Sequence, residues 1–175
     1  MSNGYTNIEP IREIAPYLDA INVDVKGNEE VYRKLCQGSL IPVLKSLLEY
    51  KKHKIWIEIT SLIIPGYNDS VKWITFLSKW IKDNLGKATP LHLSRFFPHY
   101  KMLDIEPTPI ETLKKLYQEA KKKLDYVYLG NVLESKYENT YCPRCGEIAI
   151  KREGFKTEIK KLECKKCDQK IIGIF

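Results

Sequence analysis

Two pairs of closely spaced cysteines near the carboxyl end form the strongest chemical signal in the sequence. The segments CPRCG and CKKC contain two C-x2-C pairs with 18 residues between them, and the four cysteines are Cys142, Cys145, Cys164 and Cys167. Each pair can turn two thiolates toward one ion, and four thiolates suit tetrahedral zinc. Because four thiolates leave no open coordination position, the spacing predicts a structural Zn²⁺ site.

Three other uses of paired cysteines compete with zinc. Redox-active pairs belong at the start of a helix in a thioredoxin-like unit, which this sequence does not offer. Disulfides are rare in cytosolic chains outside hyperthermophiles. An iron–sulfur site also uses thiolates, but the wide separation of the pairs and the strand-like residues between them favour zinc. The fifth cysteine, Cys36, stands alone in a helical segment and is expected to be a core residue.

A second group of polar residues lies in the segment AINVDVKG, residues 20–27, which reads as a strand. Side chains alternate along a strand, so its valines face one way and its polar residues the other. The polar residues are Asn22, Asp24 and Lys26. Strands of parallel sheets are usually apolar on both faces, so this row needs a reason. Either it faces a bound ligand, or Asp24 and Lys26 form a structural ion pair.

The elements that would position these groups alternate regularly along the chain. Apolar periodicity and turn residues predict strands over 20–26, 54–64, 91–96 and 126–130. Periodicity and capping residues predict helices over 8–18, 28–37, 40–52, 70–85 and 109–123. The last helix is expected to begin with a capping box of Thr108 and Glu111, with Pro109 at its first position. Repeated strand–helix alternation indicates βαβ units, so the predicted fold class is α/β with parallel strands.

Polar residues gather where ligands bind in such sheets, at the carboxyl ends of the strands. Asp24 and Lys26 would lie at one such end. The other strands carry polar groups within them or at their ends: Glu58, Thr60, Ser94, Arg95 and Asn131. This convergence favours the ligand-site interpretation over the ion pair.

The alternation ends near residue 140, where short strand-like segments surround the cysteines. We therefore predict two domains, residues 1–139 and residues 140–175. The second domain reads as a zinc ribbon with a hairpin around Gly154, and its core would be Tyr141, Phe155 and Phe175. Since about 35 residues cannot build a stable core alone, metal binding is expected to supply the folding energy of this domain.

Composition limits the classes of partner. The formal net charge is +7, and Arg supplies only five of the 29 basic residues. Because base-reading sites favour Arg, this charge permits nucleic-acid binding without arguing for it, and a solvated lysine-rich surface explains it better. No apolar run has the length of a membrane span, and residues 1–10 lack a signal-peptide pattern. The expected location is cytoplasmic.

Six stretches taken together resemble a known family. They are SNGY, LDAINVDVKG, TSLIIPGYND, LHLSRFFPHYKM, YVYLGNV and ENTYCPRCG, in this order. Together they resemble the C-terminal half of the AmmeMemoRadiSam-system radical SAM enzymes, which are related to the pyruvate formate-lyase activating enzymes. The resemblance runs from residue 2 to residue 175 and includes the tail with the cysteines.

The resemblance implies a partial βα barrel that holds S-adenosylmethionine and a [4Fe–4S] cluster at the carboxyl ends of its strands. It implies that Asp24 and Lys26 face S-adenosylmethionine, as the acidic and basic positions of a D-x-K strand. A carboxylate can accept hydrogen bonds from ribose hydroxyls or an amino group, and an ammonium can pair with a carboxylate. Ser2 and Asn3 match the end of the preceding strand at the same site. His99 is a further candidate for cofactor binding, because related enzymes carry a histidine after the strand that matches 91–96.

Departures from the family pattern limit the predicted activity. The chain lacks the C-x3-C-x2-C triplet that holds the cluster, and it starts at what would be the fourth strand of the barrel. Either the enzyme is split between two polypeptides or the sequence is a fragment. On both interpretations the chain is inactive without an N-terminal half.

An open half barrel exposes a strand edge, so we expect an N-terminal radical SAM half as partner, or pairing between copies of this chain. The substrate, a protein or a small molecule, is not readable from the residues. The alternative function is a non-catalytic zinc-ribbon protein that binds nucleic acid or a protein partner.

Overall fold

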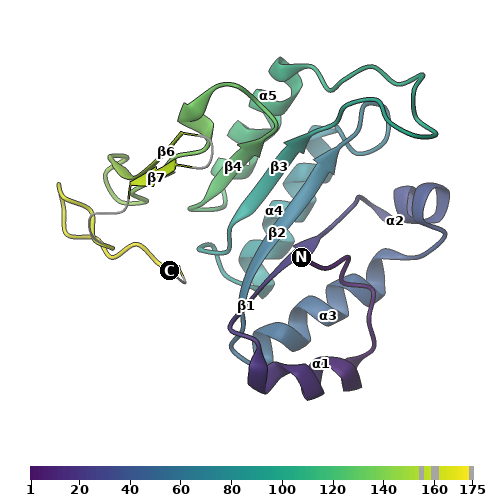
Figure 1. Cartoon of the computed structure of the whole chain (residues 1–175), viewed down its shortest axis with the longest axis horizontal. Helices are drawn as coiled ribbons and strands as arrows, with labels where there is room; N and C mark the ends of the chain where they lie inside the picture. The colour runs from purple at the N-terminus through teal and green to yellow at the C-terminus, as the bar shows by residue number, and fades with distance from the viewer. Residues whose placement is uncertain (154–155, 159–161, 174–175) are drawn as a thin grey trace.

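The computed structural model of the chain is an α/β fold with a small second sheet (Figure 1). It describes residues 1–153, 156–158 and 162–173. The main sheet contains four strands in the order β1-β2-β3-β4, and all neighbouring strands are parallel. Their bounds are β1 (Ala20–Asp24), β2 (Trp56–Ile63), β3 (Leu91–Arg95) and β4 (Val127–Gly130). The predicted parallel α/β architecture is therefore confirmed, with each strand slightly shorter than expected.

Helices cover one face of this sheet and leave the other face open. The α-helices are α1 (Ile8–Ile14), α2 (Glu29–Val31), α3 (Leu40–Lys52), α4 (Val71–Asn84) and α5 (Ile110–Lys121). In β2 the side chains alternate between buried and partly exposed, and the buried ones pack with those of α3, α4 and α5 in one apolar core. In the described part of the chain, no helix has both the length and the apolar character needed to cross a membrane.

Several expectations about helices were wrong. The helix predicted over 8–18 divides into α1 and a 3₁₀ turn, η1 (Ala15–Tyr17). Residues 28–37 form a short α2 followed by a π-helical turn, η2 (Tyr32–Cys36), and Cys36 at the end of this turn is exposed rather than a core residue. Cys36 is the last residue of this turn, because Gln37 after it adopts a left-handed conformation with a φ of 51°. The capping box at Thr108 does not form. The fully buried Thr108 hydroxyl donates to the Ile63 carbonyl and accepts from the Phe96 amide, so it ties strand ends together instead.

The carboxyl-terminal module is a three-stranded antiparallel sheet of β5 (Thr140–Tyr141), β6 (Ile148–Glu153) and β7 (Lys156–Glu158). A single 3₁₀ turn, η3 (Ser135–Tyr137), leads into it. Gly154, Phe155 and Phe175, which the sequence assigned to the hairpin turn and the module core, lie outside the described residues. A small apolar cluster of Tyr126, Ile150 and Ile171 packs the module against the sheet beside β4. The division into domains at residue 140 stays a prediction.

A buried carboxylate links α1 to α3. Glu49 has a side chain only 5% exposed, and its oxygens accept hydrogen bonds from Arg12 at 2.9 Å and from Lys52 at 2.8 Å. These two cations hold the pKa of Glu49 at about 2, well below its ordinary value of 4.5. The ionised form is therefore favoured in the folded protein.

We expect Glu49 to make the folded state sensitive to acid. A carboxyl whose folded pKa is depressed stabilises the fold fully above its unfolded pKa, and this stabilisation is lost as pH falls toward about 2. In Glu49→Gln, the free energy of unfolding should fall less steeply between pH 4.5 and about 2, as urea denaturation at several pH values would measure. Glu13→Gln, which changes an exposed carboxylate of α1, is the control and should keep the wild-type slope.

Candidate functional site

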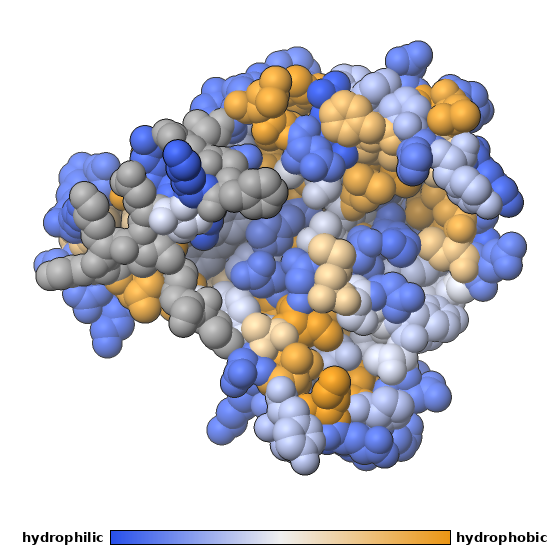
Figure 2. Space-filling model, viewed as in Figure 1, coloured by the Kyte–Doolittle hydropathy of each residue, from blue (hydrophilic) through white to orange (hydrophobic). Residues whose placement is uncertain are grey.

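The open face of the sheet carries a continuous polar surface. The alternate residues of the strands that face away from the helices are partly exposed and mostly polar: Asn22, Asp24, Glu58, Thr60, His92, Ser94 and Tyr128. Figure 2 looks onto this face and shows hydrophilic side chains gathered over the centre of the sheet. A pocket of about 550 Å³ lies there, between Asn22 on one side and Gly130 on the other. The polar row predicted in β1 is thus one part of a face that crosses all four strands.

Glu58 and His92 form the central hydrogen-bonded pair of this pocket. His92 Nε2 lies 2.9 Å from Glu58 Oε2, and the Trp56 indole donates to Glu58 Oε1 at 3.3 Å. The hydrogen bond from His92 lowers the pKa of Glu58, and because an ionised carboxylate has no proton to donate, Nε2 of His92 is the donor. The imidazole also stacks on the Tyr128 ring, with centroids 5.0 Å apart. Glu58, His92 and Tyr128 are therefore held rigidly by one another.

Asp24 and Lys26 lie at the carboxyl end of β1 and form an ion pair. Lys26 Nζ is 2.5 Å from Asp24 Oδ2, and the two side chains are 40% and 23% exposed, respectively. The other carboxylate oxygen, Asp24 Oδ1, is buried and has no hydrogen-bond partner among the described residues. A buried oxygen without a donor is costly unless a ligand or water supplies one. The pair therefore keeps one acceptor available for a bound molecule.

Ser2 extends the sheet beyond β1. Its amide donates to the Asn22 carbonyl at 2.8 Å and its carbonyl accepts from the Asp24 amide at 2.9 Å, the pattern of a parallel strand. The side chains of Ser2 and Asn3 accept hydrogen bonds from the amides of Gly4 and Tyr5. Gly4 has a φ of 67°, and a Cβ there would lie 2.7 Å from a Val23 methyl, so this turn requires glycine.

Asn68 fixes the backbone around Lys26. Its buried side-chain amide donates to the carbonyls of Lys26 and Leu62 and accepts from the Ile64 amide, each at 2.7 Å. The loop after β2 is thereby tied to the loop after β1. The sequence contains this residue within the segment TSLIIPGYND, but only the fold reveals its partners.

Other predicted residues have different places. His99 is exposed in the loop after β3, and among the described residues no hydrogen bond or ion pair joins it to Asp24 or Lys26. The Arg95 guanidinium donates to the Thr108 carbonyl at 2.8 Å, and the Asn131 amide donates to the Arg95 carbonyl at 3.1 Å. Arg95 and Asn131 thus hold loops together at the sheet end. His99 as a cofactor ligand stays a prediction.

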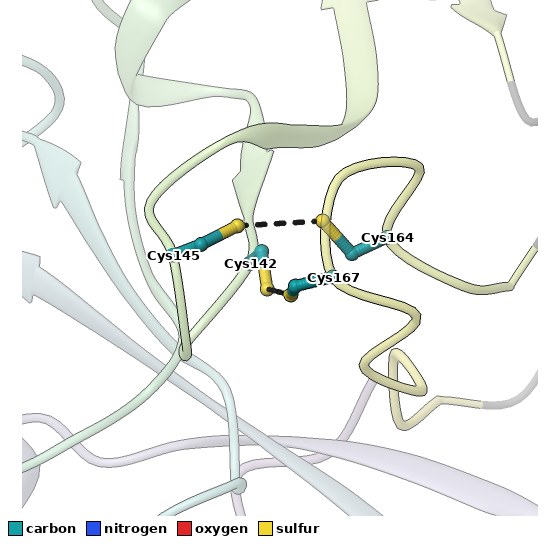
Figure 3. A group of neighbouring side chains, drawn as sticks. All are labelled: Cys142, Cys145, Cys164 and Cys167. Carbon is teal, nitrogen blue, oxygen red and sulfur yellow. Dashed lines mark hydrogen bonds between the residues drawn. The ribbon is translucent and has the colours of Figure 1, made fainter.

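The four cysteines converge in the module, as Figure 3 shows. All four Sγ atoms lie within 4.8 Å of one another, with 3.6 Å between Cys142 and Cys167 and 3.5 Å between Cys145 and Cys164. Four sulfurs placed about 2.3 Å from one central ion, at the corners of a tetrahedron, would lie about 3.8 Å apart. The spacing therefore fits a single metal ion, and a [4Fe–4S] cluster would need more room.

The backbone of the first cysteine pair favours a thiolate. Burial works against ionisation of Cys142, but hydrogen bonds from the amides of Cys145 and Arg144 outweigh it and lower the pKa of the thiol to about 7. A thiol must lose its proton to bind a metal ion, so the turn prepares Cys142 as a ligand.

Comparison with solved structures defines the class of fold. A domain of a pyruvate-formate lyase-activating enzyme from Bacteroides vulgatus has a TM-score of 0.64 to this chain at 15% identity, covering 74% of this chain and 79% of that one. A radical SAM methyltransferase from Sphaerobacter thermophilus has a TM-score of 0.55 at 16% identity, covering 73% of this chain and 38% of that one. The chain therefore has part of a radical SAM-like α/β fold, joined to a four-cysteine site that could hold a metal ion.

A curated relative is similar over almost the whole chain. An uncharacterized protein of Methanocaldococcus jannaschii is 45% identical over 177 residues, which cover 98% of this chain and 53% of that protein. The chain thus spans about half the length of the relative. No family model matches the sequence.

One carboxylate oxygen at the edge of the open face has an unused acceptor. Asp24 Oδ1, buried and without a partner among the described residues, suits a hydroxyl or amino donor of a bound molecule. The cysteines do not fit a [4Fe–4S] cluster on this face, because the sequence has five cysteines, four of which converge in the module and one of which is the isolated Cys36.

Sequence reasoning missed three side chains of the open face: His92, Tyr128 and Arg152. His92 stands two residues before Ser94 in β3, so strand alternation alone would have placed it on the same face. Tyr128 follows by the same alternation from Gly130. Arg152 belongs to the carboxyl-terminal module, and no local pattern links it to the sheet.

Proposed function

We propose that this chain is the C-terminal part of a radical SAM enzyme related to the glycyl-radical activases, as its resemblance to the AmmeMemoRadiSam enzymes implies. The observation that carries this proposal is the polar open face, at whose edge Asp24 keeps an unpartnered acceptor. In this class, S-adenosylmethionine bound at a reduced cluster supplies the radical that takes hydrogen from the substrate. The residues of this chain bind and orient: Asp24 accepts from the cofactor, and Lys26 pairs with its carboxylate.

The cluster-binding residues belong to an N-terminal half that docks along β1. Ala20 and Asn22 point their backbone groups toward the same edge on which Ser2 already pairs in parallel. A groove of about 510 Å³ follows this edge and includes the apolar side chains of Ile14, Leu18 and Tyr50. A further parallel strand with a covering helix would satisfy the edge and bury these side chains.

We propose that the metal ion of the module is Zn²⁺ in a structural role. Four thiolates around one ion is the ligand set of structural zinc. The alternative function, a non-catalytic zinc-ribbon protein, is less well supported, because the polar groups converge on the sheet rather than on the module.

The proposal is tested by rebuilding the enzyme from two chains. The chain alone, after anaerobic treatment with iron and sulfide, should not produce 5′-deoxyadenosine from S-adenosylmethionine. A polypeptide carrying the C-x3-C-x2-C motif, whether it is encoded separately or is the preceding part of the same protein, should restore production when the two are mixed. Robust production by the isolated chain would contradict the proposal, as would a mixture in which the two chains bind but S-adenosylmethionine stays intact.

Two variants test the groove beside β1 as the docking surface for the N-terminal half. Ile14→Lys places a charge in the groove beside β1, and Ile41→Lys changes a comparably exposed isoleucine on α3. Because Ile14 is 49% exposed, docking can bury only about half of it and contributes about 0.8–1.5 kcal/mol, so Ile14→Lys should weaken association by about 4- to 12-fold, while Ile41→Lys leaves it unchanged. Calorimetric titration measures both. Equal weakening by the two variants would remove the groove from the proposal.

A further inference from the structure

The carboxyl-terminal module reaches into the pocket on the open face of the sheet. Arg152, on β6, lines the pocket of about 550 Å³ together with Ser94, Tyr128 and Gly130 of the main sheet. It also lines a second, smaller pocket of about 200 Å³, whose other lining residues include Ile150 and Ile171. The module is thus a wall of the candidate site, although its cysteines lie elsewhere.

Several contacts fix the Arg152 guanidinium in this place. Its Nη1 donates to Thr140 Oγ1 at 2.6 Å and to the Glu138 carbonyl at 3.1 Å, and its backbone amide donates to Asn139 Oδ1 at 2.7 Å. The guanidinium carbon lies 5.6 Å from the centre of the Tyr128 ring. Thr140 Oγ1 is in turn hydrogen-bonded to the Tyr128 hydroxyl at 2.9 Å. Arg152 of the module is therefore held against Tyr128 of the sheet, directly and through Thr140.

Among the described residues, the oxygens that hold the guanidinium are a hydroxyl and a carbonyl, which are neutral and orient its charge. Glu58, a carboxylate of the same pocket, takes its hydrogen bonds from His92 and Trp56, and its pKa is lowered chiefly by the bond from His92 and to a smaller extent by the charge of Arg152. A planar guanidinium with five N–H donors recognises carboxylates and phosphates through paired hydrogen bonds. Ser94 adds a hydroxyl at the same end of the pocket, and its Oγ lies only 2.8 Å from where a Cβ on Gly130 would stand. Glycine at position 130 thus keeps room for Ser94.

We propose that Arg152 binds an oxyanion, a carboxylate or phosphate group of the substrate, at the β4 end of the open face, and that the four-cysteine module serves to present it. Tyr128 and Thr140 are positioning residues that aim the guanidinium. The assignment of this group to the substrate rests on the proposed function, whereas the binding of an oxyanion by Arg152 does not.

The experiment titrates the metal-loaded full chain with inorganic phosphate and, in a second arm, with malonate as a carboxylate. Nuclear magnetic resonance follows the backbone amides and the arginine Nε–H signals. Saturable shifts are expected at Arg152, Tyr128 and Ser94. Arg152→Gln should weaken the affinity by about 10-fold or more, since it removes charge-assisted hydrogen bonds. Arg152→Lys keeps the positive charge but loses the paired N–H donors, so its affinity should lie between those of the wild type and Arg152→Gln. The arm that binds more tightly identifies the class of oxyanion.

The matched control is Arg33→Gln, an exposed arginine on η2 that pairs with Glu29 at 3.5 Å. It should bind both anions like the wild type. Absence of saturable shifts in the wild type, or wild-type affinity in Arg152→Gln, would overturn the proposal. If Arg152→Gln fails to fold, the test rests on Arg152→Lys. Wild-type affinity in Arg152→Lys would overturn recognition of the oxyanion by the paired N–H donors of the guanidinium. The titration needs neither a partner chain nor S-adenosylmethionine. A negative titration therefore contradicts only the oxyanion site, and a negative two-chain experiment contradicts only the proposed function.

Discussion

Removing the metal ion from the four-cysteine site is expected to unfold the carboxyl-terminal module while the four-stranded sheet stays folded. Two of the three strands of the module have only two and three residues, and its described apolar contacts are a small cluster shared with Tyr126 of the sheet side. Four-cysteine zinc sites in small domains contribute about 10–16 kcal/mol of apparent binding free energy, which exceeds what so small a core provides. The sheet has its own continuous apolar core and does not depend on the ion.

A chelator titration followed by nuclear magnetic resonance measures this difference. Signals of residues 140–173 should collapse toward random-coil positions, while those of β1 to β4 stay dispersed away from the contact with the module. Cys164→Ser, which changes a buried ligand, should reproduce the effect without a chelator. Cys36→Ser changes the exposed cysteine of η2 and should leave both parts folded.

The metal content itself is part of the same test. We expect one equivalent of zinc per chain after anaerobic purification. Less than half an equivalent, or a module that keeps its dispersed signals without metal, would contradict a structural role. Collapse of the whole chain would instead show that sheet and module fold as one unit.

Replacing Asp24 or Lys26 with alanine is expected to weaken binding of S-adenosylmethionine in the two-chain complex far more than it weakens the fold. Each substitution removes about one charge-assisted hydrogen bond, worth roughly 1.5–3 kcal/mol, which is about 10- to 150-fold in affinity. The ion pair joins side chains that are 40% and 23% exposed, so breaking it should cost only about 0.2–1 kcal/mol of stability.

A double-mutant cycle separates the two interpretations of this pair. If Asp24 and Lys26 acted as a buried structural pair, each single variant would lose about 3–5 kcal/mol and the double variant would recover most of the loss. Urea denaturation gives the stabilities, and calorimetry gives the cofactor affinities of both singles and the double. Large, mutually rescued stability losses with unchanged affinity would remove Asp24 and Lys26 from the site. Lys34→Ala, which breaks an exposed pair with Glu30, is the control for loss of a surface ion pair.

Local patterns in the sequence predicted much of the fold. The helix over 40–52 matches α3 residue for residue, and of the two candidate caps for α4, Asp69 and Ser70, it is Ser70 that accepts from the Trp73 amide. Regular strand–helix alternation sufficed for the parallel sheet, because each such unit has one right-handed way to pack. The two C-x2-C pairs likewise predicted a site whose sulfurs meet, since the ligands of each pair lie within one short turn.

Expectations that depended on long-range partners were less successful. Thr108 was predicted to cap a helix. In the fold its hydroxyl instead accepts from the Phe96 amide and donates to the Ile63 carbonyl, and neither residue belongs to that helix. Cys36 was expected in the core of a helix, but it ends a π-helical turn and is exposed. A capping preference read from nearby residues fails when the buried polar side chain forms its hydrogen bonds with residues elsewhere in the structure.

The sequence by itself determined the class of the fold: the order of strands and helices, the polar row of β1 and the four cysteines that could hold a metal ion are all local in the chain. Only the tertiary structure decided which groups meet. The hydrogen bond between Glu58 and His92 spans 34 residues, and the side chain of Asn68 reaches the Lys26 carbonyl across 42. Arg152 lies against Tyr128 because the small apolar cluster at Tyr126, Ile150 and Ile171 docks the module on the sheet. Such contacts form when separate segments bury a common apolar surface, and no periodicity within one segment encodes its partner.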